Sequence, residues 1–337
     1  MKPLLILSAC ALVVAATTAV QPAAVPEKFS GYAEWRRNSA LIVDGQRVTL
    51  AAKGKFKGDN TARSMETVPL GYEASGKGTR LVDGTIAATD IEFKPNGNAL
   101  FEGDVKQATA AMEAKWLAAG RVVETDSKGK EVSMGELHRS GPDVDRVRRI
   151  ADRLIPPYLK TSDFRAYVVT NKDWNAFACA NGMIVVYDAL LHDADDDEMA
   201  IVLGHELVHA THEHSRKEFK SSMFLQLALV GALAGAGHGD PNKANAVLGL
   251  ASGFAMTTIV NGYSRDAEDQ ADRVGLRYAF EGGFDVRKGP PLWDKFATKY
   301  GDQAGAVNFF FGNHSSAEAR AKNLRREIAL NYASARH

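Results

Sequence analysis

Residues 195–209 read Asp-Asp-Asp-Glu-Met-Ala-Ile-Val-Leu-Gly-His-Glu-Leu-Val-His, an acidic cluster followed by an apolar run that ends in a pair of histidines. The acidic side chains suit the N-terminus of a helix, because they interact favourably with the helix dipole. In an α-helix a step of four residues advances roughly 6 Å and turns about 400°, so His205 and His209 share one face and can reach one metal ion. Glu206 is displaced around the helix, where it can act as the general base of zinc-assisted peptide hydrolysis.

A third ligand is needed before this pair becomes a catalytic metal site. Downstream, residues 264–272 place Glu268 and Asp272 four positions apart, on one face of a second helix. We expect Glu268 to complete a His-His-Glu set that binds one Zn²⁺ ion and leaves the fourth tetrahedral position open. Asp272 would accept a hydrogen bond from the distal ring nitrogen of a zinc-binding histidine. Without the histidine pair, both carboxylates would be typical of a solvated helix face.

His212 and His214 are competing third ligands. His212 shares the face of the histidine pair but lies about 4.5 Å further along the axis, and His214 points to the opposite side of a straight helix. We expect both to have helix-end or hydrogen-bonding roles instead. A metzincin site would need glycine at position 212 and histidine at position 215, so the sequence excludes that class.

The segment from about Val144 to Arg326 resembles the M48 metallopeptidases. The motifs that carry the resemblance occur in the family's order, and they are Asn175-Ala176-Phe177-Ala178, Gly182-Met183-Ile184-Val185-Val186, His205 to His209, Ser264-Arg265 with Glu268, and Ala271-Asp272. The resemblance implies zinc at His205, His209 and Glu268, with Glu206 as general base. It also implies a gluzincin fold, in which a small sheet and a helical bundle hold the ion between two helices.

The chain departs from the family pattern at two places. Cys179-Ala180-Asn181-Gly182 stands where the family often has Leu-Pro-Gly-Gly, and His314-Ser315 stands where the family has a late His-Pro element. The resemblance makes His314 a further candidate catalytic residue, which would either block the open zinc position or steady the oxyanion. The alternative is a loop histidine in a segment that caps the next helix.

Residues 1–19 have the features of a secretory signal peptide. One positive charge at Lys2 is followed by no other charge through Val25, and small residues precede a cleavage site after Ala19. A membrane anchor is the alternative, but Ser, Thr and Pro dilute the apolar stretch, which is marginal for the roughly 20 residues of a span. Leu7-Ser8-Ala9-Cys10 resembles a lipobox but comes too early, so we do not expect a lipoprotein acylated at Cys10. The sequence therefore predicts a periplasmic or secreted protein.

Residues 30–105 are predicted to form a β-rich domain. Asp44-Gly45 and Asp83-Gly84 each separate two short apolar runs, as in type I′ hairpins. The segment resembles a small OB-like β-barrel, and its alternating charges favour a packing or partner-docking role over nucleic-acid binding. A helix over 108–119 and a linker fill residues 106–142, and residues 143–337 form the M48-type domain. The predicted fold class is α+β, with a small β-barrel before a mainly helical gluzincin-type domain that contains a small sheet.

The composition excludes other classes. The chain has 337 residues, a length typical of two domains, with 41 basic and 41 acidic side chains, and this lack of net charge gives no reason to expect a nucleic-acid partner. Two cysteines, Cys10 and Cys179, cannot form a disulfide framework. With Cys10 removed, Cys179 is expected to be a small packed residue.

Two apolar stretches lie within residues 223–260, and each is short for a membrane span. We expect a helical hairpin packed on the zinc domain, with a flap that contacts membrane or envelope proteins as the alternative. The sequence does not determine the oligomeric state.

Together these features predict an exported zinc endopeptidase whose substrates are polypeptides. The resemblance implies unfolded or misassembled envelope proteins as those substrates, which could pair as a strand with Met183 to Tyr187 or with the lip at Phe177. The rival hypothesis is a latent client-binding protein or chaperone that uses the same zinc domain without routinely cutting. A purely structural zinc site is disfavoured, because such a site needs neither an open position nor Glu206.

Overall fold

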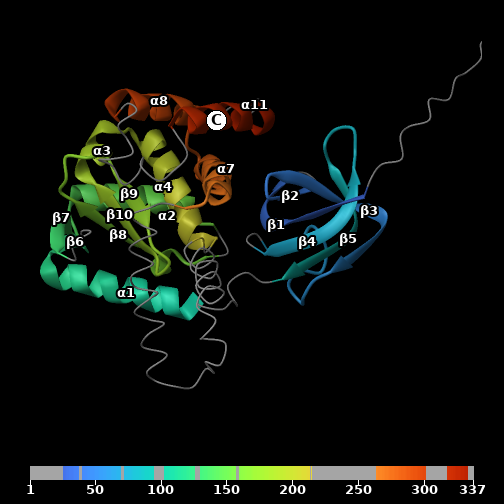
Figure 1. The fold of residues 1–337 in the computed structure, drawn as a ribbon, viewed down its shortest axis with the longest axis horizontal. Helices are drawn as coiled ribbons and strands as arrows, with labels where there is room; N and C mark the ends of the chain where they lie inside the picture. Colours follow the sequence, from blue (N-terminus) through green and yellow to red (C-terminus); the bar gives the residue numbers. More distant parts are fainter. Residues whose placement is uncertain are drawn as a thin grey trace, which may run out of the picture.

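The computed structural model describes residues 26–37, 40–69, 72–94, 102–125, 130–156, 159–212, 214, 263–300 and 317–332. A closed β-barrel comes first in the chain, and a helical domain with its own sheet follows (Figure 1). The predicted α+β class is confirmed. The predicted signal peptide 1–19, the apolar segment 223–260 and His314 lie outside the described residues. Within the described part of the chain, no helix combines the length and the hydropathy that a membrane span requires.

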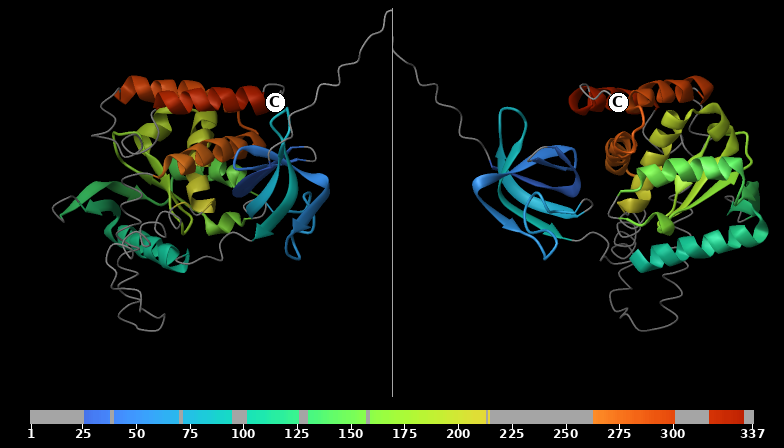
Figure 2. Two further views of the ribbon diagram at one scale, coloured as in Figure 1. Left: turned by 45° about the vertical axis from the view of Figure 1, so that its right-hand side comes forward. Right: turned by 180° about the vertical axis from the view of Figure 1, so that it is seen from behind.

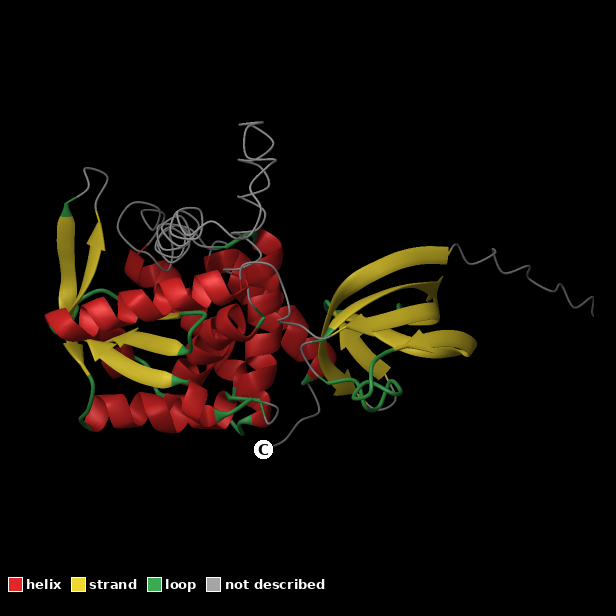
Figure 3. Ribbon diagram, turned by 90° about the horizontal axis from the view of Figure 1, so that it is seen from below, coloured by secondary structure: helices red, strands yellow, loops and turns green. Residues whose placement is uncertain are grey.

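The N-terminal barrel has five strands in the order β1-β2-β3-β5-β4, and only the β3–β5 pair is parallel. Its core is formed by apolar side chains such as Leu41, Ile86 and Phe93. Figure 3 shows its strands set apart from those of the second sheet. The strands are β1 (Pro26–Arg37), β2 (Ala40–Val43), β3 (Gln46–Lys57), β4 (Glu73–Arg80) and β5 (Ile86–Lys94).

The two Asp-Gly turns of the barrel differ. Asp44 and Gly45 have φ values of 48° and 71°, so the predicted type I′ turn is confirmed between β2 and β3. At the second turn only Gly84 has a positive φ, and the type I′ prediction is wrong there. Strand β4 ends at Arg80 and strand β5 begins at Ile86, so the loop between them is longer than two residues. A hydrogen bond from the Thr85 amide to the Asp83 carboxylate stabilises this loop.

The second sheet has the order β6-β7-β8-β10-β9. The two predicted strands of this region correspond to β8 and β10, which run parallel to each other in the middle of the sheet. The β6–β7 hairpin occupies residues interpreted as linker, and the adjacent buried residues Val122 and Val123 were the overlooked signal. The strands are β6 (Arg121–Thr125), β7 (Glu131–His138), β8 (Arg165–Val169), β9 (Ala176–Ala178) and β10 (Met183–Tyr187).

Helices cover both faces of this sheet. Successive side chains of β10 point to opposite faces, and Met183, Val185 and Tyr187 pack toward α1 while Ile184 and Val186 pack toward the other helices. Figure 2 shows α8 and α11 side by side on the face opposite α1. The helices are α1 (Glu102–Ala119), α2 (Pro142–Leu154), α3 (Asp188–Asp193), α4 (Asp196–Thr211), α7 (Arg265–Glu281), α8 (Gly289–Tyr300) and α11 (Ala317–Asn331), with short 3₁₀ turns at Thr161–Asp163 and Val286–Lys288.

Helix α1 is tied to the sheet by the buried Glu113. Its carboxylate accepts two hydrogen bonds of 2.8 Å from the Arg165 guanidinium, one of 2.7 Å from the Tyr167 hydroxyl and one of 2.6 Å from the Asn181 amide. Burial favours the neutral acid, but these donors outweigh it and hold the pKa of Glu113 below 4.5. The charged form is therefore the one that attaches α1 to the sheet.

Replacing Glu113 with glutamine should lower the free energy of unfolding by about 2 kcal/mol, because Arg165 loses its bidentate partner. A group whose pKa is lowered by folding stabilises the protein above its unfolded pKa. The difference between wild type and variant should thus be complete above pH 4.5 and shrink as the pH falls below it. Urea denaturation across this pH range measures the effect.

Glu131→Gln is the matched control. Glu131 of β7 pairs with Lys115, which lies on α1 like Glu113, but this pair is exposed. This variant should keep the wild-type unfolding free energy. Equal losses in the two variants would contradict the role given to Glu113.

Candidate active site

Helix α4 carries the histidine pair through the centre of the domain. Its start is fixed by a capping box, in which the Asp195 side chain accepts from the Glu198 amide and the Glu198 carboxylate accepts from the Asp195 amide. Every residue from Glu198 to His209 is buried, so the helix packs on all sides. The helix ends at Thr211, with His212 at its C-cap.

Two glycines allow α4 and α7 to approach each other closely. A Cβ atom on Gly204 would lie 2.5 Å from the carbonyl oxygen of Gly275, and one on Gly275 would lie 2.5 Å from the backbone nitrogen of His205. Both distances are too short for any other residue to fit without movement of a helix. The contact brings Glu268 and Asp272 of α7 to the level of the histidines of α4.

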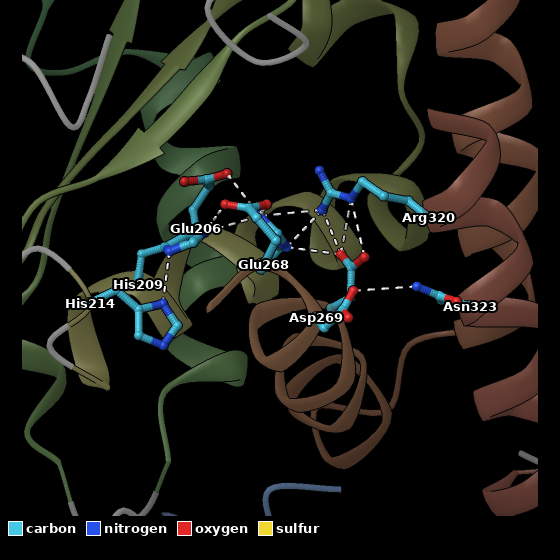
Figure 4. Close-up of polar contacts among 9 residues, drawn as sticks. Glu206, His209, His214, Glu268, Asp269, Arg320 and Asn323 are labelled. Carbon is cyan, nitrogen blue, oxygen red and sulfur yellow. Dashed lines mark hydrogen bonds and ion pairs between the residues drawn. The ribbon is translucent and has the colours of Figure 1, made fainter. Parts of the chain in front are cut away.

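The predicted ligands converge at this crossing (Figure 4). The Nε2 atoms of His205 and His209 lie 3.1 Å apart, and carboxylate oxygens of Glu268 lie 3.4 Å from the first and 3.5 Å from the second. Tetrahedral zinc with bonds of about 2.0–2.2 Å keeps its ligands about 3.4 Å apart. All three side chains are buried. The donor set and its spacing therefore fit a zinc ion.

The distal nitrogens of both histidines are occupied as well. Nδ1 of His205 donates to Asp272 at 2.9 Å, the contact that the sequence predicted for Asp272. Nδ1 of His209 lies 2.9 Å from Nδ1 of His214, and the Tyr263 ring stacks on the His209 imidazole with centroids 3.9 Å apart. Such contacts fix the ring orientation and leave each Nε2 directed at the metal position.

Neither His212 nor His214 belongs to the ligand cluster of the described residues. The His212 ring lies 3.1 Å from the Thr211 hydroxyl and packs edge-on against Tyr32 of the barrel. His214 lies beyond the end of α4, so its side chain turns back toward His209. The expectation of hydrogen-bonding roles for this pair agrees with these contacts.

Arg320 of α11 is a buried site residue that sequence reasoning missed. Its guanidinium donates to Asp272 at 2.5 Å and stacks 3.6 Å above the Trp293 ring. Burial opposes ionisation of Asp272, but Arg320 and His205 outweigh it and lower the pKa of this carboxyl. A buried arginine has no sequence signature of its own; the useful signal was the position of Arg320 on an otherwise amphipathic C-terminal helix.

Burial and neighbouring charges also shift the pKa values of Glu206 and His205. Burial, reinforced by the neighbouring Glu268, raises the pKa of Glu206 to about 7. For His205, burial and Arg320 oppose the charged form, but Asp272 and Glu268 raise its pKa to about 9. Glu206 Oε1 is buried, lies 3.9 Å from Nε2 of His205 and accepts no hydrogen bond from the described residues. A carboxylate oxygen in this situation suits a ligand that is supplied from outside the chain.

Comparison with known proteins identifies the domain that holds this site. Residues 143–328 match the model of peptidase family M48. The chain belongs to this family. The predicted relationship is confirmed, and the M48 domain is a metallopeptidase domain that includes every residue of the cluster.

Three M48 relatives illustrate the extent of the similarity. The metalloprotease YcaL of Escherichia coli K12 is 30% identical over 167 residues, which cover 50% of this chain and 62% of YcaL. The mitochondrial metalloendopeptidase OMA1 of Bos taurus is 31% identical over 144 residues, covering 41% and 27%. The beta-barrel assembly-enhancing protease of Yersinia pestis is 28% identical over 212 residues, covering 57% and 41%. The chain thus spans less than two thirds of each of these relatives.

Replacing Gly275 with alanine should separate α4 from α7 and with them the metal-binding groups. We expect a loss of about 3 kcal/mol in unfolding free energy from overpacking and metal affinity at least about tenfold weaker. Denaturant titration and a chelator competition assay measure the two effects.

Gly289→Ala is the control, since its new Cβ would first meet the flexible end of Leu324 at 3.1 Å. That variant should keep the metal affinity of the wild type. The proposed constraint would be wrong if Gly275→Ala bound metal as tightly as Gly289→Ala.

Proposed function

We propose that this M48 chain is an exported zinc endopeptidase that hydrolyses peptide bonds in unfolded or misassembled envelope proteins. The observation that carries the proposal is the convergence of His205, His209 and Glu268 on one buried point, with Glu206 beside it. The name of the Yersinia relative, a beta-barrel assembly-enhancing protease, supports the envelope part of the proposal.

His205, His209 and Glu268 would hold the ion. When bound, zinc would supply Lewis-acid chemistry that polarises the peptide carbonyl and activates water. Glu206 would remove the proton from the attacking water and pass it to the leaving amine. Asp272 would keep His205 in the tautomer that leaves Nε2 as a ligand. Arg320 would keep Asp272 ionised and in place.

The substrate is proposed to bind as an extended strand along β9. Of the two strands considered from the sequence, β10 is wrong for this role, because β8 and β9 already pair with both of its edges. Strand β9 contains the other candidate, Phe177, and stands last in the sheet formed by the described strands. Its Ala178 amide also makes a hydrogen bond that lowers the pKa of Glu206. A strand added beside β9 would therefore lie next to the proposed base, with little demand on its sequence.

Replacing Glu206 with glutamine should lower the rate of casein cleavage roughly 10²- to 10⁴-fold while the variant still binds one zinc ion, because the base is lost and the ligands remain. Metal analysis and a casein digestion assay test this. A chelator should abolish the wild-type activity, and added zinc should restore it.

Glu268→Gln provides the contrast, because it should lose zinc together with activity. If Glu206→Gln retained zinc and also the whole biological effect, the latent client-binding hypothesis would replace the catalytic one. Full casein cleavage by Glu206→Gln would exclude Glu206 as the base.

The export part of the proposal predicts a defined N-terminus. Expression in a Gram-negative bacterium should yield a periplasmic protein that begins at Val20, because residues 1–19 are removed as a signal peptide. Intact mass measurement checks this. A retained Met1, or a lipid-modified N-terminus at Cys10, would contradict it.

A further inference from the structure

The barrel reaches the metal-binding region through one buried carboxylate. Glu34 of β1 is only 2% exposed. Its Oε2 accepts from the Gly45 amide of the barrel at 2.9 Å, while its Oε1 accepts from Gln270 at 3.0 Å and from Arg273 at 3.1 Å, both on α7. A buried acid is retained only with such donors, so its partners on α7 are part of its environment.

The hydrogen bonds continue from Gln270 to a proposed zinc ligand. The side-chain oxygen of Gln270 lies 2.9 Å from Nε2 of His214, and Nδ1 of His214 lies 2.9 Å from Nδ1 of His209. Figure 4 shows His214 directed at His209. All four side chains are buried. Glu34, Gln270, His214 and His209 therefore form a continuous relay from the barrel to the metal-binding cluster.

The chemistry of the end group fixes the direction of every bond. Burial raises the pKa of Glu34, while Arg273, Gln270 and the Gly45 amide favour its ionised form. The ionised carboxylate can only accept, so the amide nitrogen of Gln270 faces Glu34 and its oxygen faces His214. Nε2 of His214 must then donate, and in the neutral imidazole this leaves Nδ1 as an acceptor. Nδ1 of His209 must therefore donate, and Nε2 of His209 is left without a proton. An unprotonated Nε2 is the form that binds zinc.

The two histidines of α4 are thus supported differently. His205 donates directly to Asp272 of α7, within the M48 domain. From Nδ1 of His209, hydrogen bonds lead instead through His214 and Gln270 to an acid that belongs to the barrel.

We propose that Glu34 is a positioning residue for the zinc centre, which sets the tautomer and orientation of His209 through Gln270 and His214. The barrel is then a component of the metal centre as well as a docking module. The inference rests on the proposed function, because it takes His209 to be a zinc ligand.

A purely structural role for Glu34 would work through a different neighbour. Arg273 bridges Glu34 and Asp44 of the barrel, with 3.1 Å to each, and Arg277 lies over the Trp35 ring. If Glu34 only helped to dock the barrel, loss of Asp44 would have a comparable effect on the zinc centre. Among the described residues, Asp44 shares Arg273 with Glu34 but makes no hydrogen bond to Gln270, so a variant of Asp44 distinguishes the two roles.

The test measures zinc affinity of the full chain by competition with a chromophoric chelator. Gln270→Met breaks the relay at its centre and leaves the Arg273–Glu34 pair and the Arg277–Trp35 contact in place. Gln270→Met and Glu34→Ala should each weaken zinc binding about tenfold. The double variant should be no weaker than Gln270→Met alone, since Glu34 acts through Gln270. Asp44→Asn should bind zinc as the wild type does.

A second readout reports on the ligand field. In the cobalt-substituted protein, the visible absorption bands should shift in Gln270→Met and Glu34→Ala but not in Asp44→Asn. Hydrogen exchange of the β1 amides should show that the barrel of Gln270→Met stays docked. If Glu34→Ala fails to fold, Gln270→Met against Asp44→Asn still decides the question.

Wild-type affinity and an unchanged cobalt spectrum in Gln270→Met would overturn the relay and leave the proposed function standing. Additive losses in the double variant, or an equal loss in Asp44→Asn, would also overturn it. A wild-type chain that binds no zinc would instead overturn the proposed function and the relay together.

Discussion

The close contact between α4 and α7 is the constraint on which the rest of the structure depends. Gly204 and Gly275 meet without side chains between the two backbones. Only at this separation can a carboxylate of α7 approach both imidazoles of α4 to about 3.4 Å. The same contact places Asp272 against the distal nitrogen of His205. The metal-binding geometry is therefore a consequence of helix packing, because all three groups of the cluster lie on α4 and α7.

The contact also concentrates charge where water cannot screen it. Glu206, Glu268 and Asp272 are all buried, and each has a carboxylate oxygen within 3.9 Å of a ring nitrogen of His205. Arg320 is the cation that α11 supplies. Burial raises the pKa of Glu206, whereas the carboxylates of Asp272 and Glu268 raise the pKa of His205 against the effect of burial. A divalent ion would offset the excess negative charge. The same arrangement thus suits a metal ion, and α11 contributes the arginine that pairs with Asp272.

The barrel and the sheet contribute at opposite sides of α4. On one side, β9 forms the end of the described sheet and makes a backbone contact with Glu206. On the other, the barrel places Glu34 against α7 and, through it, connects to His209. Proposed substrate binding and proposed ligand positioning thus meet on a single helix. In this proposal, a shift of the barrel relative to α7 would change the orientation of His209 through the hydrogen bonds of Gln270 and His214.

The sequence alone determined the elements whose causes are local. The spacing of His205, Glu206 and His209 follows from helix periodicity, the capping box follows from Asp195 and Glu198, and the Asp44-Gly45 turn follows from its tolerance of positive φ. The order of the motifs was also enough to predict the M48 family and the α+β class. Sequence patterns missed the β6–β7 hairpin, because most side chains of β7 are exposed or half-buried and give only a weak apolar alternation.

Only the tertiary structure decided which distant groups meet. Glu34 and Gln270 are separated by 236 positions, and Arg320 and His205 by 115, so no spacing rule relates them. Their contacts depend on how β1, α7 and α11 pack around α4. The role of His214 was hidden for the same reason, since a straight helix would turn it away from His209, whereas the structure places Nδ1 of His214 2.9 Å from Nδ1 of His209. Helix periodicity predicts which residues a few positions apart share a face. Contacts between distant segments depend instead on tertiary packing.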